Sequence, residues 1–201
     1  MSTRRSGRTQ RRPRSSLVFD ISRLGRRPGS MLELHETVPS PSRIGLDLIA
    51  IERGADLNLD LRLESVSEGV LVTGTVDALT SGDCSRCLTP VTGDVEISLT
   101  ELFAYPDSAT ESTTEEDEVG HVVDDAIDLE QAIVDAVGLA LPFAPVCTED
   151  CAGLCTTCGV SLADAEPDHH HEGIDPRFAK LAKMFPAADE ENTPEPGAGA
   201  S

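Results

Sequence analysis

The chain has 201 residues, of which 39 % are hydrophobic and only 3 % are aromatic. This composition suits one medium domain with a modest aliphatic core, so a bound metal would contribute to its folding. The sequence has no run of about eighteen apolar residues that could span a membrane, and residues 1–16 lack the apolar stretch of a signal peptide. We therefore expect a cytoplasmic protein with no membrane partner.

The charge is divided unevenly along the chain. Residues 1–27 contain nine Arg and one acid, Asp20, for a net charge of +8, so the remainder must carry −28 to give the total of −20. An acidic body repels nucleic acid at long range, whereas a short basic segment attracts it. We predict a disordered basic arm over residues 1–15 and expect any RNA contact to involve this arm or a local basic patch.

Alternation of apolar and polar residues predicts a series of strands. Short strands are expected at residues 17–21, 44–48, 57–63, 70–76 and 95–99. Because the connections are short, these strands favour an antiparallel β meander or a small open barrel. With two helices, this gives an α+β fold.

Residues 106–118 are rich in Ser, Thr, Asp and Glu and predict a solvated acidic loop. A helix is then expected from Asp128, with Gln131 completing a capping box and Pro142 ending the helix. The segment after it, residues 147–171, contains most of the cysteines and all three consecutive histidines.

A second helix is predicted near the C-terminus. Asp175 fits the N-cap and Pro176 the first helical position. One face of this helix is apolar and should meet the body, while the other carries Arg177, Lys180 and Lys183. We expect residues 16–185 to form a single domain and residues 186–201 to be a disordered tail.

The six cysteines and the histidine triplet form the most distinctive pattern in the chain. They comprise Cys84-x2-Cys87, then Cys147-x3-Cys151-x3-Cys155-x2-Cys158, then His169, His170 and His171. A C-x2-C pair in a tight turn can place two thiolates about 2.3 Å from one tetrahedral ion. In a chain without a secretion signal, such cysteines indicate zinc ligands before disulfides.

Two groupings of the ligands are compatible with this spacing. In the first, Cys84, Cys87, Cys147 and Cys151 bind one zinc, and Cys155, Cys158, His169 and His171 bind a second. In the other, the two C-x2-C pairs share a single site and Cys147 and Cys151 are spare. We favour the first grouping because it leaves no thiol unexplained. A redox role for one C-x2-C pair is the competing interpretation.

Catalytic motifs are absent from the sequence. It contains no H-E-x-x-H, G-x-S-x-G or P-loop pattern, and no Pro stands directly before Cys84 or Cys155, as a zinc deaminase would require. Thiolate-rich zinc sites are usually closed and structural. We therefore expect a protein that is not an enzyme and has no small-molecule substrate.

The motifs together resemble those of the YceD family, the large ribosomal RNA subunit accumulation proteins. The resemblance runs from about Leu17 to Phe185 and rests on Cys84-Ser85-Arg86-Cys87-Leu88, Leu141-Pro142 before Cys147, Cys151-Ala152-Gly153-Leu154-Cys155-x2-Cys158-Gly159, and Ile174-Asp175-Pro176-Arg177-Phe178. Many bacterial members carry C-x-C where this chain has His169-His170-His171. Imidazole can replace thiolate at zinc, so a mixed-ligand site is compatible with the resemblance.

The resemblance implies a bacterial or plastid protein that supports normal levels of 23S ribosomal RNA without catalysis. Its partners would be 23S RNA or a large-subunit precursor particle, contacted through the basic arm, or a basic ribosomal protein bound by the acidic body. The alternative from another class is a redox- or zinc-dependent RNA-processing enzyme.

Overall fold

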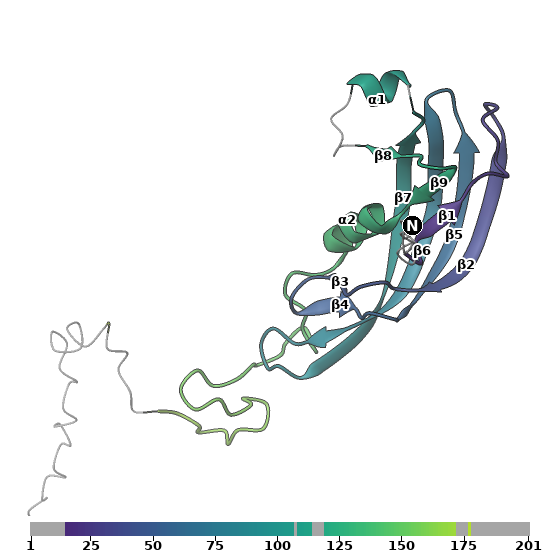
Figure 1. Cartoon of the computed structure of the whole chain (residues 1–201). Coiled ribbons are helices and arrows are strands. Elements are labelled where there is room, and N and C mark those ends of the chain that lie inside the picture. The colour runs from purple at the N-terminus through teal and green to yellow at the C-terminus, as the bar shows by residue number, and fades with distance from the viewer. Residues whose placement is uncertain (1–14, 107, 114–118, 172–176, 178–201) are drawn as a thin grey trace, which may run out of the picture.

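The computed structural model describes residues 15–106, 108–113, 119–171 and 177 (Figure 1). The predicted basic arm up to residue 14, the tail from residue 186, and the predicted helix at residues 175–185 lie outside the described residues, except for Arg177, which is exposed.

The described chain is mostly antiparallel sheet with two helices. Its elements are β1 (Val18–Asp20), β2 (Met31–Pro39), β3 (Ile44–Gly45), β4 (Ile49–Ile51), β5 (Asp56–Ser65), β6 (Gly69–Asp83), β7 (Pro90–Ala104), α1 (Ala109–Thr113), β8 (Gly120–His121), β9 (Ala126–Asp128) and α2 (Glu130–Ala140). The main sheet runs β2-β5-β6 and continues from β6 to β7 and β8. β4 also pairs with β6, beyond the part of β6 that pairs with β5, and β3 pairs with β4; β1 and β9 form a separate pair. The sheet is open, and its β5-β6-β7 part is the predicted meander.

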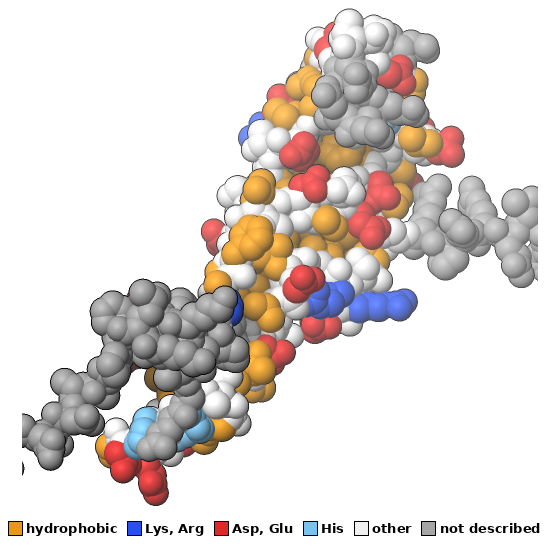
Figure 2. Space-filling model, turned by 90° about the vertical axis from the view of Figure 1, so that its left-hand side faces the viewer, with side chains coloured by type: hydrophobic (Ala, Val, Ile, Leu, Met, Phe, Trp, Pro, Cys, Tyr) orange, Lys and Arg blue, Asp and Glu red, His pale blue; other side chains and the backbone are white. Residues whose placement is uncertain are grey.

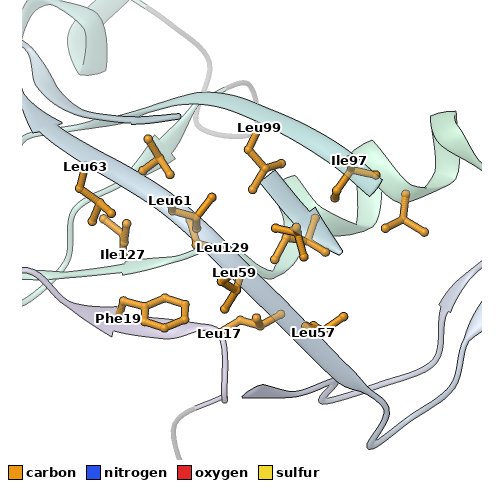
Figure 3. Packing of buried hydrophobic residues seen from close by; sticks show 14 of the residues in the cluster. Leu17, Phe19, Leu57, Leu59, Leu61, Leu63, Ile97, Leu99, Ile127 and Leu129 are labelled. Atoms are coloured by element: carbon orange, nitrogen blue, oxygen red, sulfur yellow. The ribbon is translucent and has the colours of Figure 1, made fainter. Parts of the chain in front are cut away.

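β5 shows why the sheet has one dry face and one wet face. Its side chains alternate between exposed and buried, with Leu57, Leu59, Leu61 and Leu63 all pointing into the core. These leucines project to the same side as Leu17 and Phe19 of the N-terminal segment and Ile127 and Leu129 near β9, as Figure 3 shows. Period-two alternation therefore places β1, β9 and α2 on one face of the sheet and leaves the other face to solvent.

α2 lies on the dry face and packs against β7 and β3. Ile133 and Val137, four residues apart, are its buried side chains, which agrees with the predicted helical face. The predicted capping box is wrong. The helix begins at Glu130, whose N–H donates to Asp128 Oδ1 at 3.0 Å, and the Gln131 side chain binds Asp135 instead of reaching back.

Four further elements differ from the expectation. The acidic segment at residues 106–118 is not entirely a loop, because α1 occupies Ala109–Thr113; the Ser108 hydroxyl accepts a hydrogen bond from Glu111 N–H at 3.1 Å and the Glu68 carboxylate accepts from Ala109 N–H at 2.8 Å. β2 was not predicted. It is an edge strand whose apolar residues are only half-buried, so the alternation is weak. β6 and β7 also extend well beyond their predicted cores.

The extra length of β6 and β7 creates a projecting hairpin. β5 pairs with β6 only as far as Ala78, whereas β7 follows β6 to the last pair, Asp83 and Pro90. β4 pairs with β6 near this end. A Cβ at Gly82 would lie 2.0 Å from Leu48 O, so the close approach of the two backbones requires glycine. The hairpin thus carries its connecting loop, residues 84–89, away from the core.

No helix in the described part of the chain has the length and apolar character needed to cross a membrane. Hydrophobic side chains gather along the side of the molecule that carries α2 (Figure 2).

Candidate metal centres

The first candidate centre begins in the hairpin loop between β6 and β7. The Leu88 N–H donates to Cys84 O at 2.9 Å, and the Cys84 N–H donates to Thr89 O at 2.9 Å. Leu88 has a φ of 59°, in the left-handed region. These bonds close a tight turn that brings the thiols of Cys84 and Cys87 to the same side.

The other two thiols of this centre arrive with the segment that follows α2. The Ser85 N–H donates to Pro145 O at 2.8 Å, which fixes the segment beside the loop. Arg86 then reaches across and donates to two backbone carbonyls of the segment, Cys151 O at 3.0 Å and Glu149 O at 3.3 Å. Cys147 and Cys151 are thereby placed opposite the hairpin thiols.

The distances between these sulfur atoms match those of a tetrahedral zinc site. Cys84 Sγ lies 3.8 Å from Cys151 Sγ, and Cys87 Sγ lies 3.6 Å from Cys147 Sγ. Four sulfurs at about 2.3 Å from one ion would be about 3.8 Å apart. A disulfide requires about 2.05 Å, and all six cysteines are free. The donor set therefore fits a tetrahedral zinc ion.

The second candidate centre repeats the same turn. The Gly159 N–H donates to Cys155 O and the Cys155 N–H donates to Val160 O, both at 2.8 Å. Gly159, with a φ of 76°, occupies the place that Leu88 has in the first turn. The two C-x2-C loops thus share one hydrogen-bonding pattern, although only the first is held between long strands.

Histidine completes the second centre. Cys158 Sγ lies 3.6 Å from His169 Nε2, and the ligand atoms of Cys155, Cys158, His169 and His171 all lie within 4.8 Å of one another. His170 does not belong to this group; its Nδ1 is 2.6 Å from Asp168 O. Histidine side chains of this segment lie at the surface at one end of the molecule (Figure 2).

The electrostatics of the thiols also favour a cation. Burial raises the pKa of Cys84, but backbone N–H groups of Arg86, Cys87 and Cys147 outweigh it and lower the pKa to about 6. The imidazole of His169, followed by the backbone N–H groups of Cys158 and Thr157, lowers the pKa of Cys155 to about 5. N–H groups directed at sulfur stabilise thiolate, which is the form that binds metal.

The two thiols that the segment after α2 brings to the first centre, Cys147 and Cys151, show the opposite effect. The neighbouring Cys87 thiol raises the pKa of Cys147, and at Cys151 burial and the three adjacent thiols overcome the Gly153 N–H and raise the pKa to about 12. Four thiolates cannot be negative together at this spacing unless a cation neutralises them. A dication would remove this conflict.

The segment from Cys151 to Leu162 connects the two centres. The Leu154 N–H donates to Arg86 O at 3.1 Å, and the Leu162 N–H donates to Gly153 O at 2.9 Å. Arg86 therefore joins the hairpin loop to both centres. This role of Arg86 could not be found from the sequence, because its contacts link residues that are far apart in the chain.

The structure brings the eight predicted ligands together in the first of the two groupings: Cys84, Cys87, Cys147 and Cys151, then Cys155, Cys158, His169 and His171. The setting of Cys84 and Cys87 differs from that of a thioredoxin-like pair. They lie in a hairpin loop between antiparallel strands and not at the start of a helix.

Comparison with known proteins identifies the family. The family model described as large ribosomal RNA subunit accumulation protein YceD matches residues 72–185. The chain belongs to the YceD family. In this YceD protein the match begins within β6 and includes all eight candidate ligands, whereas β1 to β5 precede it.

The YceD chain is also similar to several whole proteins. It is 69 % identical over 176 residues to an uncharacterized protein of Mycobacterium tuberculosis, covering 88 % of this chain and 84 % of the relative. It is 62 % identical over 177 residues to an uncharacterized protein of Mycobacterium leprae, covering 88 % and 81 %. The uncharacterized protein YlbN of Bacillus subtilis is 27 % identical over 175 residues, covering 87 % and 99 %. No solved structure matches the chain.

Proposed function

We propose that this YceD protein is a non-enzymatic cytoplasmic factor that supports the accumulation of 23S ribosomal RNA and that two structural zinc ions stabilise its C-terminal segment. The ribosomal role is supported by membership of a family whose description names large-subunit ribosomal RNA accumulation. The zinc proposal is supported by the two four-donor groups described above.

The single observation that carries the structural role of zinc is the closure of both groups. Each provides four protein donors whose ligand atoms lie within 4.8 Å of one another. A catalytic zinc keeps one coordination position for water or substrate, and a set of four protein donors leaves none. The thiolates and imidazoles would therefore occupy every coordination position of the ion, and the ion would stabilise the folded segment.

The segment that the ions would stabilise has little other support. Between Cys147 and His171 the only regular pairing among the described residues is an isolated bridge from Leu154 to Ser161. Its attachment to the hairpin loop depends on a few backbone hydrogen bonds and on Arg86. Metal binding and folding of such a segment are coupled, so loss of zinc would release it from the hairpin.

The charge of the chain suggests how the factor would meet its partners. Its total of −20 disfavours a broad RNA contact, so RNA would be engaged through the arginine-rich residues 1–14. The acidic body would instead bind a basic ribosomal protein. Both contacts would place the factor on a large-subunit precursor.

Metal content and RNA level test this proposal together. Untagged protein purified without chelator should contain one to two zinc ions per chain, and Cys87→Ser or Cys158→Ser should lower zinc content and thermal stability together. Thr156→Ser is the matched control, because it changes an exposed residue between two ligands and removes no donor.

In a strain lacking the gene, the wild type and Thr156→Ser should restore the ratio of 23S to 16S RNA, and the cysteine variants should restore it less. Absence of zinc together with six freely titratable thiols would refute the metal proposal. An unchanged 23S level in the deletion strain would refute the ribosomal role. Rapid alkylation of native, zinc-loaded Cys84 or Cys87 would favour the redox alternative.

A further inference from the structure

The solvent-facing side of the sheet carries a group of carboxylates on three neighbouring strands. This is the face turned away from β1, β9 and α2 in Figure 1. Its lower half presents Asp56 on β5, Asp77 on β6, and Asp94 and Glu96 on β7. We call these four residues, with Leu79 between them, the acidic hollow.

These carboxylates lack the partners that neighbouring acids have. On the same face, Glu64 lies 3.2 Å from Arg62, and Asp60 lies 3.0 Å from His35. Within the described residues, none of the four carboxylates of the acidic hollow takes part in an ion pair or a side-chain hydrogen bond. Moreover, Asp77 and Glu96 are direct cross-strand partners. Like charges opposite each other destabilise a sheet, so this pair opposes folding in the free protein.

The surface is also hollowed at this place. β5 pairs with β6 as far as Ala78 and β4 pairs with it from Ser81, which leaves a gap beside Leu79. Two adjoining hollows of about 530 and 580 Å³ lie here, and both are lined by Ala55, Leu79 and Asp94. Leu79, which lines both hollows, is 68 % exposed. An apolar residue ringed by carboxylates offers a partner both burial and charge.

The spacing of the carboxylates excludes a single bound ion. In the described part of the chain, only the two cysteine groups bring three or more ligand atoms within 4.8 Å of one another. Nucleic acid and anionic lipid would be repelled. Neighbouring strands lie about 4.8 Å apart, so three strands spread these charges over about 10 Å, the length of three to four residues of an extended chain. This arrangement suits several cations on one polypeptide.

We propose that the acidic hollow is a docking site for a Lys- and Arg-rich segment of a partner protein, with an apolar side chain of that segment seated on Leu79. Proteins that bind RNA carry such segments, so the acidic hollow would shield the RNA-binding surface of its partner until RNA displaces it. The class of partner rests on the proposed ribosomal function; the docking surface itself does not.

Fluorescence anisotropy with the full-length chain tests the proposal. The probe is a short labelled peptide in which Lys and Arg alternate with Leu, and the control peptide has Glu in place of every Lys and Arg. The test variant Asp77→Asn/Asp94→Asn/Glu96→Gln removes three charges of the acidic hollow. The matched control Glu33→Gln/Asp60→Asn/Glu64→Gln removes three charges from the other half of the same face, where all three acids are already paired.

We expect the basic peptide to bind and the acidic peptide not to bind. Each exposed ion pair changes affinity by roughly 1.5- to 5-fold, so the test variant should weaken binding roughly tenfold at about 50 mM salt and the control less than about threefold. Leu79→Ser should weaken binding several-fold without a change in salt dependence. This combination would support the proposal.

Three results would overturn it. Equal losses for the test and control variants would indicate non-specific attraction. Binding that appears only after the six arginines of residues 1–14 are replaced by Ser would assign the surface to the chain's own arm. If a labelled 23S fragment binds the same residues and the basic peptide displaces it, the surface would be assigned to RNA. Because the assay needs neither ribosomes nor zinc, its failure would leave the proposed function standing, and a normal 23S level in the deletion strain would not affect it.

Discussion

Gly153 gives the sharpest test of the contact between the hairpin loop and the cysteine segment. Its φ is 79°, and a Cβ at this position would lie 3.1 Å from Arg86 O. Gly159 has nearly the same φ, 76°, but a Cβ there would meet nothing within 4 Å. The pair Gly153→Ala and Gly159→Ala therefore separates the effect of a left-handed backbone from the effect of the contact.

The expected magnitudes follow from these geometries. Alanine in the left-handed region costs roughly 1–2 kcal/mol relative to glycine, and both variants carry this term. Gly153→Ala must in addition displace the Arg86 carbonyl or lengthen the bond from Leu154 N–H, and loss of one such hydrogen bond costs roughly 0.5–1.5 kcal/mol. We expect Gly153→Ala to be about 1 kcal/mol more destabilising, which corresponds to about a fivefold greater loss of zinc affinity if binding and folding are coupled.

Zinc competition against a chromophoric chelator measures the affinity, and urea denaturation of the loaded protein measures the stability. The reasoning predicts that Gly153→Ala weakens the first centre and Gly159→Ala the second, so cobalt substitution can show which centre has changed. Equal effects of the two variants on stability and on the first centre would refute the role assigned to the contact between Gly153 and Arg86.

Three further predictions concern other parts of the molecule. Leu61→Ala should lower the free energy of unfolding by about 3 kcal/mol in urea because Leu61 is 1 % exposed, whereas Leu139→Ala, at a residue 90 % exposed, should change it by less than about 0.5 kcal/mol. In metal-free protein, the groups that lower the pKa of Cys155 to about 5 all lie within its own short segment, so iodoacetamide should label this thiolate at pH 7 and the rate should fall as the pH drops through about 5; a labelling rate that peptide mass spectrometry shows to be unchanged across this range would contradict the assignment. Glu96→Gln should raise the free energy of unfolding by roughly 0.2–1 kcal/mol by removing the repulsion from Asp77, and the gain should shrink at about 1 M salt; a loss of stability would count against the cross-strand argument.

The features that depend on local pattern could be predicted from the sequence. The alternating leucines of β5 predicted both the strand and its buried face, and the spacing of Ile133 and Val137 predicted the buried side of α2. The cysteine spacing likewise identified the donors but allowed two groupings, and the grouping that leaves no thiol unexplained is the one that the structure brings together. These signals are short-range, because the pattern of a strand or a helix repeats within a few residues and a C-x2-C turn spans only four.

Features that depend on distant contacts could not be predicted. β2 has weak alternation because it lies at an edge, so its place beside β5 follows from pairing rather than from pattern. The hydrogen bonds from Arg86 to the cysteine segment depend on the path of the chain after α2. The cross-strand pairing of Asp77 with Glu96 depends on the register of β6 and β7. A capping box was expected at Asp128 because the residue types fit, but the helix starts one residue too late for Gln131 to reach back.

The separation of the ligands along the chain has a consequence for the order of assembly. The second centre closes the short segment from Cys155 to His171, whereas the first joins Cys84 to Cys151 across β7, β9 and α2. Closing loops of these lengths costs about 3 and about 4.5 kcal/mol of chain entropy, respectively. The local centre can therefore load on a partly folded chain, while the distant one forms only after the hairpin and α2 are in place. Occupancy of the first centre would then mark a molecule that has finished folding. Under zinc shortage, chains would have a complete sheet and helix, but the cysteine segment would not be attached to the hairpin loop.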